Sequence, residues 1–302
     1  MLRAACIDIG SNTTRLLVAD IEGRRLHPVR QERVFTALAR DLERDGRIEQ
    51  RTVDELTAVV ADQMRTAQRL GATELRAVAT AAVRRAADGR RLVRSVGERT
   101  GAAIEILSAA EEARLAFAGA VGMLERPPSG PIGVVDVGGG SCEMAVGEAS
   151  GPVSWWESVP FGSMSLTDRC LPSDPPPTSE LDEARALVRG AVAEISPPTP
   201  RRTLAVGGSA TSLCRVTGPL LDGPAVARAL ELLGGEPAAV LGERIDVDPR
   251  RVRLLPAALV LLEAIAARFG AALAIGSGGI REGLLLETAG RGRAAEGRLM
   301  GG

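Results

Sequence analysis

The sequence contains one short loop twice, and this duplication limits what the chain can fold into more than any other feature. The loop reads Asp8-Ile9-Gly10-Ser11-Asn12-Thr13 and, 136 − 8 = 128 positions later, Asp136-Val137-Gly138-Gly139-Gly140-Ser141. Each copy lies between two apolar runs, which predicts a strand, a tight turn and a second strand. Glycine in such a turn lets backbone N–H groups face an oxyanion, and hydroxyl side chains add donors. We therefore predict two phosphate-binding hairpins, one in each of two lobes that close on one phosphate chain.

The aspartate that leads each copy would lie beside the bound phosphate. A carboxylate is stable there only next to a hydrated cation or a water, so Asp8 and Asp136 are candidate metal ligands. The structural alternative is that each aspartate only caps its turn, and that Asn12 is there because asparagine tolerates left-handed backbone. The duplication favours the functional interpretation. The phosphate-binding residues predicted in the two loops are Gly10, Ser11, Asn12, Thr13, Gly138, Gly139, Gly140 and Ser141.

Two further strands in the second half end in glycine-rich turns. The apolar run 204–206 precedes Gly207, Gly208 and Ser209, and a helix follows. The free N–H groups at a helix start bind phosphate readily, so these three residues are also candidates. The turn at 276–283 has the same strand-to-helix form. Four such loops at corresponding places in two halves predict that both halves contribute to one site.

The chain of 302 residues is longer than one compact core usually fills, so two domains are expected. Strands and helices alternate, which predicts an α/β fold. Ser108 and Glu111 have the spacing of a capping box at a helix start. The proline-rich stretch 126–131 cannot continue that helix and predicts a linker. We therefore expect an N-terminal lobe at 1–125 and a C-terminal lobe at 126–302, with a frayed tail at 290–302.

Composition excludes several classes of site. The chain has no lysine, which excludes a P-loop, and its single histidine, His27, excludes Ser-His-Asp and Cys-His catalysis. The four cysteines lack the spacing of a zinc site or a disulfide framework. A net charge of −1 and 2% aromatic residues argue against nucleic-acid binding. No signal peptide or membrane-spanning run is evident, so we expect a cytoplasmic protein without a membrane partner.

Arginines are concentrated in one segment, 84–94. With a net charge near zero, a polyanionic substrate would need such a local patch. The alternative is a solvated helix face, which is the commoner use of an arginine-rich helix.

Six motifs in order carry a resemblance to a known family, and they span residues 3–290. They are Asp8–Asn12, Ala79–Arg84, Glu111–Leu115, Asp136–Glu143, Gly207–Ser212 and Gly279–Gly283. Together they closely resemble the exopolyphosphatase and guanosine pentaphosphate phosphohydrolase family. The resemblance implies an α/β fold of two duplicated ribonuclease-H-like lobes, as in actin-like and sugar-kinase-like proteins, with the active site in the cleft between them. Longer relatives add a helical domain, so this chain resembles the short two-domain form.

The resemblance also implies roles for individual residues. Glu112 would be the catalytic carboxylate that orients or deprotonates water, and Asp136 and Glu143 would hold Mg²⁺ or another divalent cation. Arg84 and the two loops would grip the phosphates. The sequence pattern also distinguishes the roles of the two neighbouring glutamates, because the capping box explains Glu111 and leaves Glu112 without a structural role.

The two copies of the loop differ in charge at one matching position. Arg15 occupies in the first copy the place that Glu143 occupies in the second. An active site between two lobes needs such an asymmetry, whereas two exposed strand residues would not. Cys142 stands where the family pattern has threonine, and its thiol would make the site sensitive to oxidation if it were exposed.

We expect a Mg²⁺-dependent hydrolase that releases orthophosphate from the end of inorganic polyphosphate. The near alternative is a phosphohydrolase for guanosine pentaphosphate, which the family resemblance covers equally and which would connect the protein to the stringent response. More distant alternatives are an ATP-binding sugar-kinase-like protein and a non-catalytic polyphosphate sensor. The expected partners are thus phosphate chains or nucleoside polyphosphates, and a homodimer is common where the resemblance applies.

Overall fold

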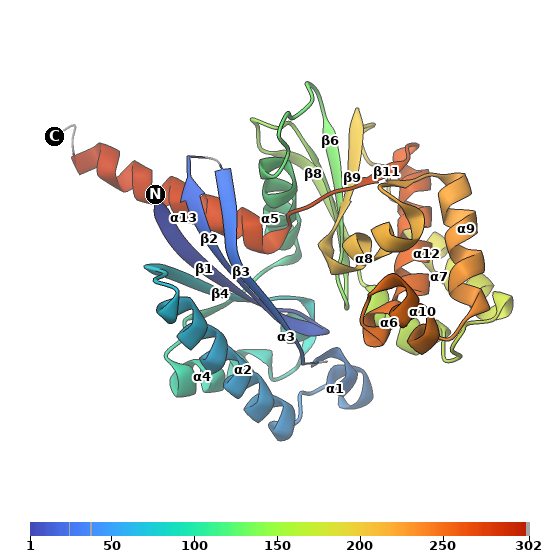
Figure 1. The fold of residues 1–302 in the computed structure, drawn as a ribbon, viewed down its shortest axis with the longest axis horizontal. Coiled ribbons are helices and arrows are strands. Elements are labelled where there is room, and N and C mark those ends of the chain that lie inside the picture. The colour runs from blue at the N-terminus through green and yellow to red at the C-terminus, as the bar shows by residue number, and fades with distance from the viewer. Residues whose placement is uncertain (24, 37, 300–302) are drawn as a thin grey trace. The chain divides into compact units, whose positions relative to one another are not determined.

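The computed structural model describes residues 1–23, 25–36 and 38–299, and the chain divides into two compact units (Figure 1). The first unit contains Met1–Glu125 together with the segment from Gly278 onward, and the second contains Arg126–Ser277. The structure therefore corrects the expected C-terminal lobe of 126–302, because its last segment packs with the first unit.

The first unit is built on a five-stranded sheet in the order β3-β2-β1-β4-β5. Strand β1 pairs antiparallel with β2 and parallel with β4, and β4 pairs parallel with β5. The strands are β1 (Leu2–Ile9), β2 (Thr13–Glu22), β3 (Arg25–Phe35), β4 (Glu74–Ala79) and β5 (Ile104–Ile106). The central strand β1 is buried along most of its length, as expected for an apolar run covered on both faces.

Helices cover both faces of this sheet. Helix α13 lies along one face, and α2 and α4 lie on the other side (Figure 1). The helices are α1 (Leu38–Asp45), α2 (Gln50–Arg69), α3 (Ala81–Arg85), α4 (Gly89–Thr100), α5 (Ala109–Gly122) and α13 (Ile280–Leu299). The amphipathic spacing at 52–70 corresponds to α2, whose buried face includes Val53, Leu56 and Val60.

The predicted capping box at the start of α5 is confirmed. The Glu111 backbone N–H donates to the Ser108 hydroxyl at 3.2 Å, and the Ser108 backbone N–H donates to the Glu111 carboxylate at 2.8 Å. Two backbone N–H groups that have no partner inside the helix are thereby satisfied. This contact fixes the point at which α5 begins.

Close glycine contacts hold α13 against α5. A Cβ added to Gly119 would lie 2.0 Å from the carbonyl oxygen of Gly279, and one added to Gly283 would lie 2.1 Å from that of Leu115. The two helix backbones can approach this far only because these residues have no side chain. The tail expected to fray from residue 290 continues α13 through Leu299, while 300–302 lie outside the described residues.

The second unit repeats the strand order of the first. Its six-stranded sheet runs β10-β11-β9-β6-β7-β8, so β8-β7-β6-β9-β11 corresponds to β3-β2-β1-β4-β5. Strand β6 pairs antiparallel with β7 and parallel with β9, as β1 does with β2 and β4. The strands are β6 (Ile132–Val137), β7 (Cys142–Gly147), β8 (Val153–Val159), β9 (Arg202–Val206), β10 (Leu220–Leu221) and β11 (Leu273–Ile275). The predicted duplication of α/β lobes is confirmed by this shared topology.

Helix α12 forms the centre of the second core and is buried over nearly its whole surface, from Leu255 to Phe269. The helices of this unit are α6 (Ser163–Cys170), α7 (Thr178–Val192), α8 (Gly207–Thr217), α9 (Gly223–Gly235), α10 (Ala238–Ile245), α11 (Pro249–Val252) and α12 (Leu255–Phe269). None of the helices that the structure describes combines the length and the apolar character needed to traverse a bilayer.

The glycine contact between α5 and α13 generates a stability prediction. Gly119→Ala should lower the free energy of unfolding by about 1–3 kcal/mol, because the new methyl group has no room against the Gly279 backbone. Gly290→Ala in α13 is the matched control: that position has nothing within 4 Å, so alanine should stabilise the helix by up to about 1 kcal/mol. Urea denaturation of both variants measures the difference, and equal effects would contradict the packing described above.

Candidate active site

The two loops close in the same way. The Gly10 N–H donates to the Thr13 carbonyl at 3.0 Å, and the Gly138 N–H donates to the Ser141 carbonyl at 3.0 Å. These positions differ by the same 128-residue offset that relates the two motifs. Within the described chain, the N–H groups of Ser11 and Gly139 donate to no acceptor. Each turn thus keeps a backbone donor for a ligand, as the phosphate-binding prediction requires.

The helix that follows the third strand supports each loop. In the first unit the Ala39 N–H of α1 donates to the Ser11 carbonyl at 2.9 Å. In the second unit the N–H groups of Met164 and Ser165 in α6 both donate to the Gly139 carbonyl at 3.0 Å. A Cβ on Gly162 would lie 2.3 Å from the Gly139 carbonyl carbon, so the approach of α6 requires glycine there. Both turns are therefore held by the same kind of contact.

The strand register places the predicted charge asymmetry at directly opposite positions. Asp8 pairs with Arg15 across β1 and β2, and Asp136 pairs with Glu143 across β6 and β7. Opposite residues on an antiparallel pair have Cβ atoms about 4.5–5.5 Å apart. The first unit therefore presents an acid and a base at this place, and the second unit presents two acids.

Asp8 belongs to a charge cluster that the sequence pattern did not predict. Its Oδ1 atom is buried and has no hydrogen-bond partner among the described residues. Burial raises the pKa of the Asp8 carboxyl, and the charges of Arg281 and Arg15 partly oppose this rise. Arg281 and Glu282 come from the start of α13 and are buried. The motif at 279–283 was part of the family resemblance, but nothing in its pattern indicated that it would reach Asp8.

The second unit has a carboxylate pair suited to a cation. The Ser158 hydroxyl of β8 donates to Glu143 Oε1 at 3.0 Å. Asp136 faces the start of α8, since a Cβ on Gly207 would lie 2.3 Å from Asp136 Oδ1. Mg²⁺ is often bound through one or two carboxylates and otherwise by waters and phosphate oxygens. Asp136 and Glu143 fit that donor set, whereas the guanidinium groups near Asp8 oppose a cation there.

No larger protein cage for a metal occurs in the part of the chain that the structure describes. A group of three or more His, Cys, Asp or Glu side chains arranged around a common point is not found there. Of the three predicted metal ligands, Asp8 belongs to the first unit, and Asp136 and Glu143 belong to the second.

The start of α8 joins the second loop. The Ser209 hydroxyl donates to the Ser163 hydroxyl at 3.1 Å, and Ser163 donates to the Gly138 carbonyl at 3.1 Å. Helix α8 begins at Gly207, whose φ of +89° is a backbone conformation that favours glycine. The predicted phosphate-binding residues of this unit, Gly138–Ser141 and Gly207–Ser209, are thus linked by hydrogen bonds through Ser163.

Glu112 lies in the first turn of α5, and it is Glu111, not Glu112, that forms the capping box with Ser108. It is only 2% exposed, and the Arg84 guanidinium of α3 forms an ion pair with its Oε1 atom. Arg84 also donates to the Leu107 carbonyl at 2.8 Å. Glu111 instead caps the helix, and hydrogen bonds from the Ser108 backbone and hydroxyl lower the pKa of its carboxyl. The structure brings Arg84 and Glu112 together, an ion pair that the two motifs alone did not predict.

Cys142 does not meet the condition for a redox role. Its side chain is 0% exposed, and burial followed by the charges of Glu143 and Asp136 raises the pKa of its thiol well above the usual range. Reactive cysteines are partly exposed and have a lowered pKa. The thiol therefore packs in the apolar core of the second unit.

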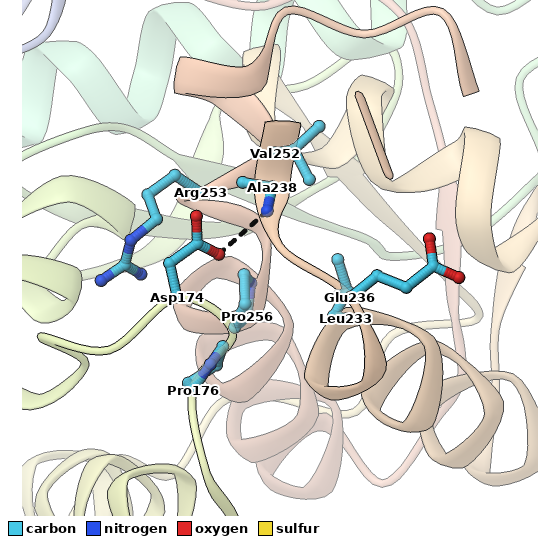
Figure 2. A pocket seen from close by; sticks show the side chains of 8 residues that line it. All are labelled: Asp174, Pro176, Leu233, Glu236, Ala238, Val252, Arg253 and Pro256. Atoms are coloured by element: carbon cyan, nitrogen blue, oxygen red, sulfur yellow. Dashed lines mark hydrogen bonds between the residues drawn. The ribbon is translucent and has the colours of Figure 1, made fainter. Parts of the chain in front are cut away.

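A small cavity in the second unit is lined by residues other than those described above (Figure 2). Within it Asp174 accepts a hydrogen bond from the Ala238 N–H at 2.9 Å. Its volume of about 10 Å³ is at the lower limit for a single water. It is lined by Asp174, Pro176, Leu233, Glu236, Ala238, Val252, Arg253 and Pro256, none of which was a predicted site residue.

Comparisons with known proteins identify a family with which this chain shares sequence and fold. The sequence model of the Ppx/GppA phosphatase family matches residues 17–217. Exopolyphosphatase 1 of Mycobacterium bovis is 30% identical over 303 residues, covering 94% of this chain and 88% of that protein. Exopolyphosphatase 2 of Mycobacterium tuberculosis is 35% identical over 198 residues, covering 63% of this chain and 61% of that protein.

A solved structure has the same fold across nearly the whole chain. The crystal structure of the Aquifex aeolicus member of the Ppx/GppA family superposes with a TM-score of 0.81 at 25% identity, covering 96% of this chain and 98% of that one. The family match, the relatives and the duplicated sheets all lead to one assignment. The chain belongs to the Ppx/GppA phosphatase family and is a hydrolase of phosphoanhydride bonds.

Proposed function

We propose that the protein is an exopolyphosphatase that releases orthophosphate from the end of inorganic polyphosphate in a Mg²⁺-dependent reaction. The observation that carries this proposal is the buried Glu112 carboxylate, which is held by Arg84 and is not needed for helix capping. The similarity to the mycobacterial exopolyphosphatases supports polyphosphate as the substrate.

The reaction requires a positioned water and neutralisation of oxyanion charge, with no covalent intermediate on the protein. Glu112 Oε2 or Oε1 would accept the proton of the attacking water, and Arg84 would keep that carboxylate oriented. The free N–H groups of the two turns would bind phosphate oxygens. Asp136 and Glu143 would hold Mg²⁺, which when bound supplies further neutralisation of phosphate charge.

The near alternative is hydrolysis of guanosine pentaphosphate, which has the same anhydride chemistry. The chain contains 2% aromatic residues, which argues mildly against a pocket that stacks a guanine base. A sugar-kinase-like activity would require transfer of a phosphoryl group to an alcohol, and a sensor would bind without turnover.

Phosphate release from tripolyphosphate, long-chain polyphosphate and guanosine pentaphosphate in one Mg²⁺ buffer tests the proposal. We expect release from polyphosphate at a higher kcat/KM than from guanosine pentaphosphate. The reverse order would favour the nucleotide activity. No release from polyphosphate of any length would reject the proposed function.

Glu112→Gln should reduce kcat by about 10²- to 10⁴-fold, because the amide cannot accept the proton of water. Substrate binding should persist, since the shape of the side chain is unchanged. Glu111→Gln is the matched control: glutamine also completes a capping box, so activity should be retained. Equal loss in both variants, measured by initial rates, would remove the proton-accepting role from Glu112.

Asp136→Asn and Glu143→Gln should each raise the Mg²⁺ concentration needed for half-maximal rate by about tenfold, since one of two charged ligands is lost. Direct Mg²⁺ titration by calorimetry should show the same weakening, and EDTA should abolish turnover of the parent protein. Glu157→Gln, an exposed change on β8, is the control and should leave Mg²⁺ dependence unaltered. A parent enzyme that is fully active in EDTA would contradict the cation site.

A further inference from the structure

Arginines on α3 and α4, which follow Arg84 in sequence, form an exposed surface outside the residues assigned to catalysis. Helix α4 follows α3 directly, and the two are packed so closely that a Cβ on Gly89 would lie 1.9 Å from the Val83 carbonyl oxygen. Arg85 at the end of α3, and Arg90, Arg91 and Arg94 on α4, are exposed. This surface therefore begins one residue after the arginine that holds Glu112.

The structure adds an arginine from a different part of the chain. The Ala87 N–H donates to the Gly46 carbonyl at 3.4 Å, which places the turn between α1 and α2 against the link between α3 and α4. Arg47 in that turn is exposed. We call the surface formed by Arg47, Arg85, Arg90, Arg91 and Arg94 the arginine track.

Most of the track has no acidic partner among the residues that the structure describes. In the described residues, Arg47, Arg90, Arg91 and Arg94 form no ion pair, although nearby Arg99 pairs with Asp54 at 2.7 Å. Exposed Glu98 is one helical turn beyond Arg94 but is not paired with it. Asp88, the N-cap residue of α4, makes no side-chain capping bond.

The positions of these arginines are unfavourable for the isolated helix. Arg90 and Arg94 are four residues apart and Arg91 and Arg94 three apart, so like charges face each other on one side of α4. Arg90 and Arg91 also lie in the first turn, where the helix dipole favours anions over cations. A bound polyanion would relieve both repulsions.

We propose that the arginine track binds a long inorganic polyphosphate chain as it leads away from the catalytic residues. This inference rests on the proposed function and specifies its substrate as long-chain polyphosphate. A linear chain with charge on every phosphate matches a row of arginines that has no aromatic side chain for stacking bases. Guanosine pentaphosphate carries only a triphosphate at its 5′ end and could not follow the track.

The test compares a variant that combines Arg90→Gln, Arg91→Gln and Arg94→Gln with the parent protein. Glutamine retains helix propensity, so α4 should still form. The control variant combines Arg25→Gln, Arg30→Gln and Arg65→Gln, which removes the same charge from exposed positions of the same unit. Both variants are assayed on tripolyphosphate and long-chain polyphosphate, and binding of long-chain polyphosphate is measured at several salt concentrations.

The track variant should bind long-chain polyphosphate at least tenfold more weakly than the parent. The slope of log affinity against log salt concentration should be shallower by about two, since three arginines are replaced and about 0.7 counterions are released per phosphate contact. Its KM for tripolyphosphate should stay within about twofold, because the replaced charges are exposed and salt screens their effect on a substrate that does not contact them. Identical behaviour of the track and control variants, or equal losses on both substrates, would overturn the inference.

Two further outcomes are decisive. If single-stranded RNA binds the parent as tightly as polyphosphate and loses affinity equally in the track variant, the track is a general polyanion surface and the inference fails. If the parent hydrolyses no polyphosphate, the proposed function fails, and the binding measurement by itself then decides whether long-chain polyphosphate occupies the track.

Discussion

The register between the two strands of each loop hairpin is the constraint on which the site depends. The bond from Gly10 to the Thr13 carbonyl, and its counterpart from Gly138 to the Ser141 carbonyl, fix which residues are opposite one another. A slip of one residue would turn every side chain of the hairpin to the other face of the sheet. The register therefore decides that Asp136 and Glu143 form a pair suited to a cation.

The two copies of the duplicated fold have different charged side chains at matching positions. In the first unit a carboxylate is surrounded by the guanidinium groups of Arg15 and Arg281, whereas in the second unit two carboxylates lie opposite each other. The backbone geometry of the turns is common to both because it depends on glycine and on hydrogen bonds within the loop. The difference lies in single side chains on the following strand, which can change without disturbing the turn.

Much of this site could be predicted from residues close together in sequence. The capping box of Ser108 and Glu111 was predicted correctly, because helix capping depends on contacts within one turn. The α/β class followed from the alternation of strands and helices, and the family resemblance implied the duplicated ribonuclease-H-like lobes. The segment 278–299 was assigned to the wrong lobe, because its place depends on glycine contacts with α5, which is more than 150 residues earlier in the chain. The expectation that the tail frays from residue 290 rested on how little it can bury, whereas α13 continues past that residue.

The sequence by itself determined the duplicated loops, the α/β class and the family resemblance, and it indicated Glu112 as the candidate catalytic carboxylate. These properties reside in local patterns of glycine, apolar residues and short motifs. Only the tertiary structure decided that Arg84 holds Glu112, that Arg281 reaches Asp8, that Cys142 is buried, and that Arg47 joins the arginines of α4. The physical reason is that ion pairing, burial and charge repulsion depend on distances between segments far apart in the chain, which packing alone sets.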